Sequence, residues 1–333
     1  MTAASGIDVH THIVPEKFPA YVGAAAPSNW PSMAPAHACH QHVMISGKVY
    51  RTVSDQCWDM TRRLNDMDGM GVAEQVISPM PELLSYWLPG PVAQQLLRFI
   101  NEEIARYVAA GGSRLTGLGA VPLQDMDLAI AELEYVVGTL KFPGVEIGSH
   151  IDGRPLGAPE FEPFFAAAEA MGACIFVHAL RPHMDRVVGP PALEQALAFP
   201  GEIGIAAASL ITTNLIERHP RLRIAFSHCA GALGLMLPRL ENIRGKVPAL
   251  AAAITSSPIS QARKFFYDAL VYDAPTLKHL TTLFGPTQIM LGTDYPFNVY
   301  ERDPHGRIEE CGFDTATRAL IVSGNARRFL GRS

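Results

Sequence analysis

The segment IDVHTHIV (residues 7–14) places two histidines, His10 and His12, one residue apart at the end of a short apolar run. In a β-strand, side chains at positions i and i+2 point to the same face, so the two imidazoles are expected to project together. Two neutral imidazoles on one face form a ready pair of metal ligands. Alone the pair is a weak signal, and its meaning depends on how the other strands end.

Seven further apolar runs follow, separated by amphipathic segments with helical periodicity such as residues 60–70 and 90–110. The runs cover residues 74–80, 115–123, 144–151, 173–180, 223–231, 265–273 and 288–297. Several are apolar at consecutive positions, as expected for strands buried on both faces. Eight strands alternating with about eight helices predict an α/β fold, a single TIM (β/α)8 barrel domain over residues 1–333.

Residues 15–58 interrupt this alternation. The stretch is rich in Pro, Ala and His and has no strong helical pattern. Within it, HVMISGKVYRTV (residues 42–53) is typical of two strands joined through Ser46-Gly47-Lys48. Because long unstructured loops are uncommon in compact domains and are usually functional, we expect a small insertion after the first strand. It should contain a hairpin and fold over the barrel mouth as a lid.

Composition excludes several classes of protein. Of 333 residues, 48% are hydrophobic and 18% are charged, which suits a large buried core rather than disorder. The net charge of −5 and the scattered basic residues argue against a nucleic-acid partner. Five cysteines without a CxxC pair, and no recognisable signal peptide, favour a reducing cytoplasm over a disulfide framework. No apolar run approaches the roughly 18 residues of a bilayer span, so no membrane partner is expected.

Polar residues recur where later strands are predicted to end. His178 closes IFVHA, His228 lies in AFSHCAG, and Asp294 lies in MLGTDYPF. Each alone is better explained as a polar residue at a strand end. In a parallel barrel, however, the C-terminal strand ends meet at one rim, where active sites are built. Together with the two histidines of the first strand, these residues predict one shared site.

These segments resemble the amidohydrolase superfamily and, within it, the 2-amino-3-carboxymuconate-6-semialdehyde decarboxylase family. The likeness extends over nearly the whole chain and includes IDVHTHIVP, VYRTVSDQCWD, VPLQDMDLA, GVEIGSH, FVH, FSHCAGALGLMLPRLEN, MLGTDYPF and IVSGNARRFL. The resemblance implies that one divalent metal ion, expected to be Zn²⁺, is held by His10, His12, His178 and Asp294. His228 would act as acid and base beside the metal-activated water.

The resemblance also implies residues for the substrate. Arg51, in VYRTV, matches an arginine that binds the substrate carboxylate, and Trp58, in CWDM, matches a tryptophan near that pocket. Arg239, in LPRLEN, matches an arginine that reaches the active site of a neighbouring subunit. We therefore expect a homodimer or higher homo-oligomer, with Arg51 and Arg239 assisting His228 in catalysis.

These groups suit a non-oxidative decarboxylation. Zinc lowers the pKa of bound water, histidine titrates near neutral pH, and arginine forks bind carboxylates. The resemblance implies a zinc-dependent carbon–carbon lyase (carboxy-lyase) of aromatic catabolism. Its small-molecule substrate would be 2-amino-3-carboxymuconate semialdehyde or a related unsaturated, hydroxylated aromatic or pyridine carboxylate. No organic cofactor is expected, because the sequence has no GxGxxG after the first strand and no P-loop.

Two other functions stay open: a metal-dependent hydrolase of a lactone or amide, and a barrel with a degenerate site that only binds partners. The fourth strand, GVEIGSHI, lacks the lysine that bridges two metal ions in dinuclear members, which favours a single ion; His150 there is expected to be structural. The chain departs from the family after the fifth strand, where HALRPHMD replaces the usual HPW. We expect Ala179, Leu180 and Arg181 to reshape the pocket wall, which leaves the substrate open.

Overall fold

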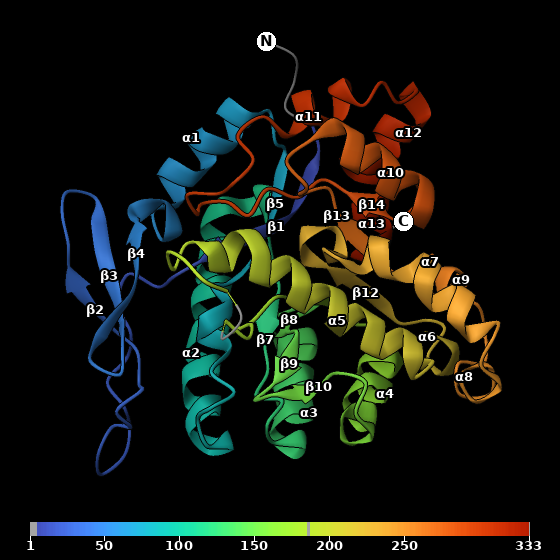
Figure 1. Cartoon of the computed structure of the whole chain (residues 1–333). Helices are drawn as coiled ribbons and strands as arrows, with labels where there is room; N and C mark the ends of the chain where they lie inside the picture. Colours follow the sequence, from blue (N-terminus) through green and yellow to red (C-terminus); the bar gives the residue numbers. More distant parts are fainter. Residues whose placement is uncertain (1–4, 185–186, 333) are drawn as a thin grey trace.

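The computed structural model describes residues 5–184 and 187–332, and its centre is a parallel sheet (Figure 1). Nine strand segments form this sheet: β1 (Ile7–Ile13), β5 (Glu74–Pro79), β6 (Leu115–Gly117), β7 (Gly119–Ala120), β8 (Gly144–Gly148), β11 (Cys174–His178), β12 (Arg223–Phe226), β13 (Phe266–Asp268) and β14 (Ile289–Met290). Each contains part of one of the predicted apolar runs. The mixed α/β class and the parallel pairing are as predicted.

The strands follow one another around a closed barrel. One parallel set runs β1-β5-β6 and the other runs β7-β8-β11-β12-β13-β14. The segments β6 and β7 belong to one stretch of chain interrupted only at Leu118, so they link the two sets. The ring is completed where the Val9 N–H donates to the Leu291 carbonyl at 3.0 Å and Thr11 forms a parallel bridge with Tyr295. Eight strand positions result.

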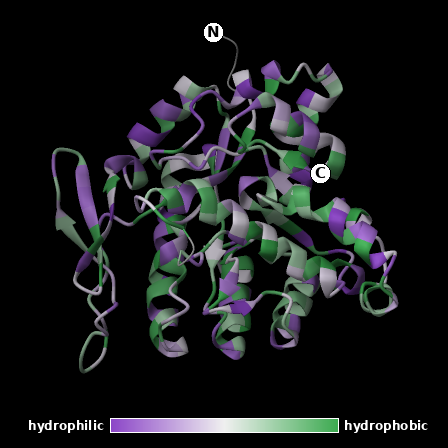
Figure 2. Ribbon diagram, in the orientation of Figure 1, coloured by the Kyte–Doolittle hydropathy of each residue, from purple (hydrophilic) through white to green (hydrophobic). Residues whose placement is uncertain are grey.

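Helices surround the barrel, with both hydrophobic and hydrophilic residues along their length, as amphipathic helices that cover a sheet require (Figure 2). They are α1 (Met60–Met70), α2 (Gly90–Gly111), α3 (Met126–Glu134), α4 (Glu162–Met171), α5 (Phe199–Thr212), α6 (Leu215–Arg218), α7 (Leu233–Arg244), α8 (Pro248–Ala253), α9 (Pro258–Ala262), α10 (Ala274–Phe284), α11 (Pro304–Glu310), α12 (Thr315–Ala319) and α13 (Asn325–Phe329). The continuous helical segment Glu194–Thr212 is long and apolar enough to cross a membrane by length and composition. Its residues Ile203 and Leu210 are fully buried, whereas Leu197 and Ile205 are exposed, so one face of the segment packs against the barrel.

Two layers of apolar side chains hold the fold together. The smaller layer fills the barrel interior and includes Val76 of β5, Phe176 of β11 and Met290 of β14, with Phe329 of α13 packed beside them. The larger layer lies between the strands and the surrounding helices. Because the interior is filled by side chains, the polar residues at the C-terminal strand ends rest on a packed base.

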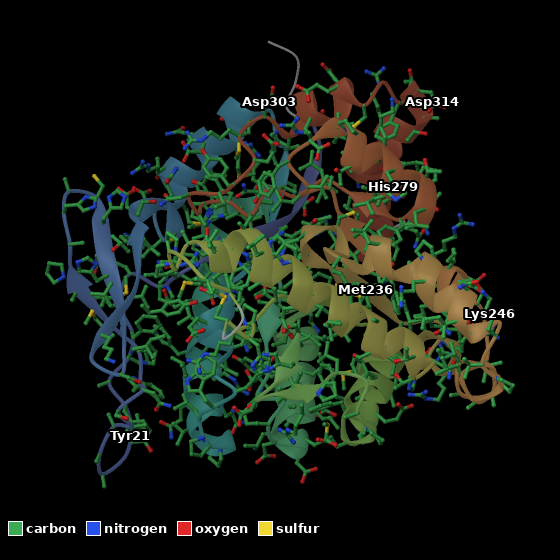
Figure 3. All side chains as sticks on the ribbon, in the orientation of Figure 1. Tyr21, Met236, Lys246, His279, Asp303 and Asp314 are labelled. Carbon is green, nitrogen blue, oxygen red and sulfur yellow. The ribbon has the colours of Figure 1, made fainter. Side chains whose placement is uncertain are left out.

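The insertion after β1 is a separate antiparallel sheet of β2 (Ser32–Pro35), β3 (His40–Ile45) and β4 (Lys48–Ser54). The predicted hairpin is confirmed: Ile45 pairs with Lys48 across the two-residue turn Ser46-Gly47, whose φ angles are both positive. Lys48 belongs to the strand rather than to the turn. The sheet lies at one edge of the molecule beside α1 and α2 (Figure 1), and Tyr21 lies in the loop before β2 (Figure 3). Its role as a lid remains a prediction.

Candidate metal centre and active site

A β-bulge in β1 aims the two histidines of the first strand. Between Asp8 and Thr11, β1 advances three residues while its partner β5 advances two. The extra residue shifts the alternation of side chains. Val9 therefore packs in the barrel interior, and the next residue, His10, also faces inward, followed by His12.

Four side chains meet at this end of the barrel. Their nearest ligand atoms all lie within 4.8 Å of one another, and the four residues are His10, His12, His178 and Asp294. The Nε2 atoms of His10 and His12 are 3.1 Å apart. The Asp294 Oδ1 atom lies 3.3 Å from the second of these nitrogens and 3.5 Å from the first. The structure thus brings together the four residues expected to bind metal.

Hydrogen bonds fix which nitrogen of each ring faces the centre. Nδ1 of His12 lies 3.0 Å from the Pro79 carbonyl, and Nδ1 of His178 lies 2.7 Å from the Ala179 carbonyl. Since each carbonyl requires a donor, both rings carry their proton on Nδ1 and turn the Nε2 lone pair inward. The buried Nε2 of His178 has no hydrogen-bond partner among the described residues.

Asp268, at the end of β13, orients the first ligand. Its Oδ2 lies 2.6 Å from Nδ1 of His10 and accepts the backbone N–H of His228 at 2.8 Å. Its Oδ1 accepts the backbone N–H groups of Cys229 and Leu270 at 2.8 and 3.1 Å. The sequence reasoning missed this residue, although FYDALVYD also places an aspartate at a strand end. The shared carboxylate couples a metal ligand to the turn that carries the proposed acid and base.

The electrostatics of the cluster are those of a cation site. Burial lowers the pKa of His12 to about 4, and burial with its histidine neighbours lowers the pKa of His178 well below its usual value. Burial also disfavours the charged form of His10, but the hydrogen bond to Asp268 and nearby carboxylates raise its pKa to about 9. Burial alone would raise the pKa of Asp294, yet His10 and His12 lower it. A carboxylate and three imidazole nitrogens at this spacing fit a divalent ion, whose binding would displace the second proton of His10.

Glu146, on β8, is a second acidic residue that the sequence reasoning did not select. It is fully buried, accepts a hydrogen bond from the Ser78 hydroxyl, and lies 3.7 Å from Nδ1 of His12. Burial raises its pKa to about 8. Glu146 therefore lies behind His12, next to the ring nitrogen that faces away from the centre.

His228 lies at the C-terminal end of β12 as predicted, in the turn that directly follows the strand. The residues His228, Cys229 and Ala230 all have positive φ, between 50° and 54°. Side-chain-bearing residues rarely adopt this region, and the carboxylate of Asp268 anchors two of their N–H groups. The imidazole of His228 is centred 5.3 Å from the ring of His10, and burial lowers its pKa. It thus stands over the metal ligands.

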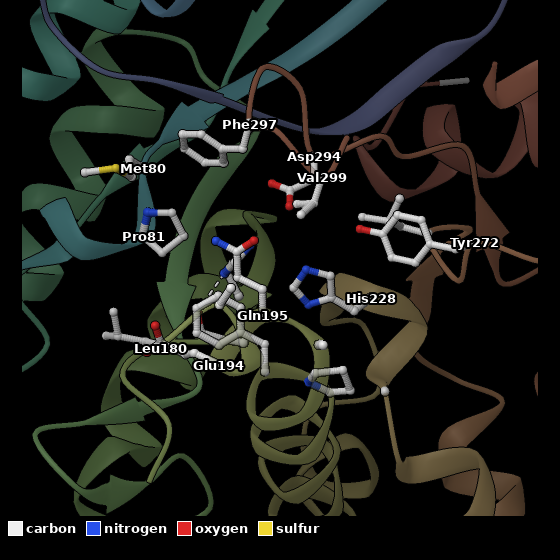
Figure 4. Close-up of a pocket in the computed structure, with 18 of the residues that line it drawn as sticks. Met80, Pro81, Leu180, Glu194, Gln195, His228, Tyr272, Asp294, Phe297 and Val299 are labelled. Atoms are coloured by element: carbon white, nitrogen blue, oxygen red, sulfur yellow. Dashed lines mark hydrogen bonds between the residues drawn. The ribbon is translucent and has the colours of Figure 1, made fainter. Parts of the chain in front are cut away.

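A cavity of about 770 Å³ opens onto this centre. His178, His228 and Asp294 line it, while His10 and His12 are fully buried beneath. Figure 4 shows the Asp294 carboxylate and the His228 ring turned into the cavity, with Phe297, Pro81 and Leu180 around it. Most of the wall is apolar, as in pockets for small organic ligands.

Arg51, on β4, also lines the cavity. Its guanidinium lies 4.5 Å above the centre of the Phe297 ring and forms no ion pair within residues 5–184 and 187–332. The antiparallel insertion therefore places a positively charged side chain in the wall of a pocket whose floor is formed by the barrel. This position suits the predicted role in carboxylate binding.

Other predicted site residues lie outside the cavity. Trp58 is half-buried and packs against the core, because it directly follows the short 3₁₀ turn Asp55–Cys57. Arg239 is exposed on α7 and does not reach the pocket of its own chain. His150, in the small hairpin of β9 (His150–Ile151) and β10 (Arg154–Pro155), accepts the Gly153 N–H at 2.9 Å and is not among the metal-ligating residues.

The chain is similar to known proteins over most of its length. A family profile described as amidohydrolase matches residues 7–332. The 2-amino-3-carboxymuconate-6-semialdehyde decarboxylase of Dictyostelium discoideum is 32% identical over 98% of this chain and 91% of its own. The crystal structure of 5-carboxyvanillate decarboxylase from Sphingomonas paucimobilis has a TM-score of 0.71 and 26% identity, covering 82% of this chain and 83% of its own.

A further structure relates the fold to a metal-containing protein. A dihydroxybenzoic acid decarboxylase from Polaromonas, solved with bound manganese, has a TM-score of 0.76 and 19% identity and covers 98% of this chain and 97% of its own. At this identity the likeness shows the shared fold. The family profile and the Dictyostelium relative show more: the chain belongs to the amidohydrolase family and, within it, to the group of 2-amino-3-carboxymuconate-6-semialdehyde decarboxylase-like proteins.

Proposed function

We propose that this protein is a metal-dependent, non-oxidative decarboxylase of an unsaturated or aromatic carboxylic acid. The observation that carries the proposal is a single cavity that brings three functional groups together. The four-residue ligand cluster lies at its floor, and its wall carries the ring of His228 and the guanidinium of Arg51, which forms no ion pair with any described residue. The names of the Dictyostelium, Sphingomonas and Polaromonas relatives, all decarboxylases, support the same reaction class.

We propose Zn²⁺ as the resident ion, held by His10, His12, His178 and Asp294. Three imidazole nitrogens and one carboxylate oxygen are a usual ligand set for zinc, and manganese accepts the same donors. When bound, the ion supplies a Lewis acid that polarises oxygen atoms next to the reacting carbon.

The protein's own residues would position the acid and supply the proton. Arg51 holds a carboxylate through paired N–H donors, and the Phe297 ring beneath it keeps the guanidinium in place. Nδ1 of His228 lies 3.2 Å from the Ser227 hydroxyl, which leaves Nε2 for the substrate. As the carbon–carbon bond to the departing carboxylate breaks, its electron pair stays on the substrate carbon, and that carbon takes a proton from Nε2 of His228 in its doubly protonated form. CO2 leaves and His228 regains its proton from solvent, so the net reaction consumes one proton.

A panel of acids tests this proposal. Metal-loaded protein is incubated with semialdehyde, hydroxybenzoic and hydroxypicolinic acids, and evolved CO2 is measured. We expect release from at least one acid, its loss on complete metal removal, and a drop of about 100-fold or more in His228→Gln, since general acids contribute roughly 10²–10⁴-fold. His219→Gln is the matched control, because His219 precedes β12 whereas the cavity turn follows it.

The outcomes separate decarboxylation from hydrolysis. CO2 release that persists without metal would refute the proposal. Hydrolysis of lactones or amides with no CO2 from any acid, and with little effect of Arg51→Ala, would instead support the hydrolase that the sequence leaves open.

We also propose that the active protein is a homodimer or higher oligomer in which Arg239 acts in trans. The motivation is that Arg239 matches a family arginine yet is exposed outside its own pocket. Arg239→Ala should lose turnover but keep the wild-type melting temperature. Mixing it with Arg51→Ala protein should restore part of the activity, because some mixed dimers contain one intact site. Unchanged turnover in Arg239→Ala would rule out the shared site.

A further inference from the structure

Glu82 and Arg181 form a forked ion pair in the wall of the cavity. Glu82 lies in the turn Pro81–Leu84 after β5, and Arg181 follows β11 by three residues. Nε of Arg181 donates to both carboxylate oxygens at 3.0 and 3.2 Å, and Nη2 also contacts Oε1. Both residues line the cavity, and Nη1 takes no part in the pair.

The environment holds this pair rigidly. The guanidinium of Arg181 lies 3.2 Å from the centre of the Trp87 ring, and its φ of 37° is unusual for a residue with a side chain. The Glu82 side chain is only 3% exposed, whereas Arg181 is 43% exposed. Burial raises the pKa of Glu82, while Arg181 and the Tyr50 hydroxyl lower it through hydrogen bonds. The acid is therefore fixed behind the arginine and cannot turn away from a ligand.

Two arginines of the described cavity wall, Arg51 and Arg181, consequently differ in ion pairing. Arg51 forms no ion pair within the described part of the chain. The Glu194 carboxylate lines the same cavity and interacts with Arg51 only beyond ion-pair distance, so the Arg51 guanidinium is free to pair with a ligand carboxylate. The charge of Arg181 is already neutralised by Glu82. A ligand carboxylate placed against Arg181 would also approach the buried carboxylate of Glu82. Two negative charges that lie close together in a buried site repel each other strongly. A hydroxyl or carbonyl oxygen would accept a hydrogen bond from Nη1 without that penalty.

We infer that the Glu82–Arg181 pair is a specificity determinant: it selects a substrate that presents a neutral hydroxyl or carbonyl oxygen to this wall and rejects one that presents a second carboxylate there. This inference rests on the proposed function, in which Arg51 holds the first carboxylate. Pro81 and Leu180, the chain neighbours of the pair, mark this side of the pocket. In Figure 4 it lies across the cavity from Tyr272.

Direct binding measurements test this selection without requiring turnover. The probes are 3- and 4-hydroxybenzoate and the matching dicarboxylates, isophthalate and terephthalate, titrated calorimetrically into metal-loaded, full-length protein. The ring and the first carboxylate are the same in each pair of probes. The ratio of the Kd of the dicarboxylate to the Kd of the hydroxy acid therefore measures how the second group interacts with the Glu82–Arg181 wall. We expect a ratio of about tenfold or more for at least one ring position in the wild type, since close like charges at binding sites are strongly disfavoured.

Glu82→Gln should reverse this preference by leaving the charge of Arg181 unbalanced. The Kd of the dicarboxylate should fall so that the ratio drops by about tenfold or more. The matched control is Glu103→Gln, which breaks a similar fork, with Nε–Oε1 and Nη2–Oε2 distances of 3.2 and 2.6 Å, at exposed Arg106 outside the cavity. An unchanged ratio in folded Glu82→Gln protein would overturn the inference.

Arg181→Met provides a second variant if Glu82→Gln does not fold. Methionine has no N–H donor, so the hydroxy acid should bind about tenfold more weakly while the dicarboxylate stays weak, since hydrogen bonds to charged groups are worth roughly a factor of ten or more. Equal binding of the hydroxy acid to this variant and to the wild type would overturn the inference. Failure of the proposed function looks different: no acid would release CO2, and Arg51→Ala would bind every probe as well as the wild type does.

Discussion

Replacing Asp268 with asparagine keeps the shape of the side chain and removes one acceptor. In the wild type, the two oxygens accept four hydrogen bonds, from Nδ1 of His10 and from the backbone of His228, Cys229 and Leu270. The carboxylate is fully buried. Asparagine offers one oxygen, which accepts, and one NH2 group, which donates and cannot accept. The NH2 group would therefore face N–H groups with which it cannot form a hydrogen bond.

The hydrogen bonds divide two and two between the oxygens, which sets the size of the effect. Whichever way the amide turns, two buried N–H donors lose their acceptor. Each unpaired donor costs about 1–3 kcal/mol, so the free energy of unfolding should fall by about 2–6 kcal/mol. That is a large share of the roughly 5–15 kcal/mol typical of folded proteins. Loss of the charge behind His10 should also weaken divalent-ion binding by about 10–100-fold, the usual effect of changing such a partner.

Two measurements check this prediction. Denaturant titration of the metal-free protein gives the free energy of unfolding, and competition with a chelator gives the affinity for Zn²⁺ or Mn²⁺. The matched control is Asp314→Asn, at the exposed start of α12 (Figure 3), where the carboxylate accepts the Thr317 N–H at 2.7 Å. Asparagine caps helices as well as aspartate does, so this change should be nearly neutral. The reasoning is refuted if Asp268→Asn loses less than about 1 kcal/mol and binds the ion within about twofold of the wild type.

Three further predictions concern the metal, a glycine and a surface carboxylate. Chelation should lower the melting temperature, because an ion at 100 times its Kd stabilises the folded state by about 2.7 kcal/mol; an unchanged melting curve would exclude a resident ion. Gly292→Ala should weaken metal binding, because a Cβ there would lie 2.7 Å from Cβ of Asp268 and 3.1 Å from Cβ of His10; wild-type affinity would contradict this. Hydrogen bonding to Arg218 lowers the pKa of Glu162 from 4.5 to about 2, so its contribution is complete above pH 4.5 and disappears as the pH falls toward 2. Glu162→Gln should therefore cost less than about 1 kcal/mol at pH 7, because the pair is largely exposed, and the difference in melting temperature should shrink below pH 4.5; a constant difference would contradict the assignment.

Much of the barrel could be predicted because hydrophobic periodicity is a local property. The segment MTRRLNDMDGM coincides with α1, and every predicted apolar run contains a strand. Strand ends were less predictable. The run 288–297 contains only the two-residue strand Ile289–Met290, because the rest of the run forms the loop that carries Asp294. A buried loop at the site is as apolar as a strand, so composition cannot separate them.

The site residues were predictable where metal-binding residue types recur at strand ends. They were unpredictable where local backbone geometry determines the direction of a side chain. Four potential metal ligands at three strand ends pointed to one centre, and they are together in the structure. The bulge in β1 left no sequence signal, although it determines where His10 points. Asp268 and Glu82 were missed because a buried acid in an apolar run looks like any other until its partners, distant in sequence, are known.

The origin of Arg51 on the three-stranded insertion has a consequence for how this enzyme type can diversify. In the proposed reaction, the chemistry would depend on side chains of the barrel, while Arg51, which would bind the carboxylate, lies on β4 in a different sheet. Changes confined to that appendage can alter which molecules are admitted and leave the catalytic floor intact. The segment between β1 and α1 is therefore a natural unit to exchange between relatives when a new preference is to be engineered.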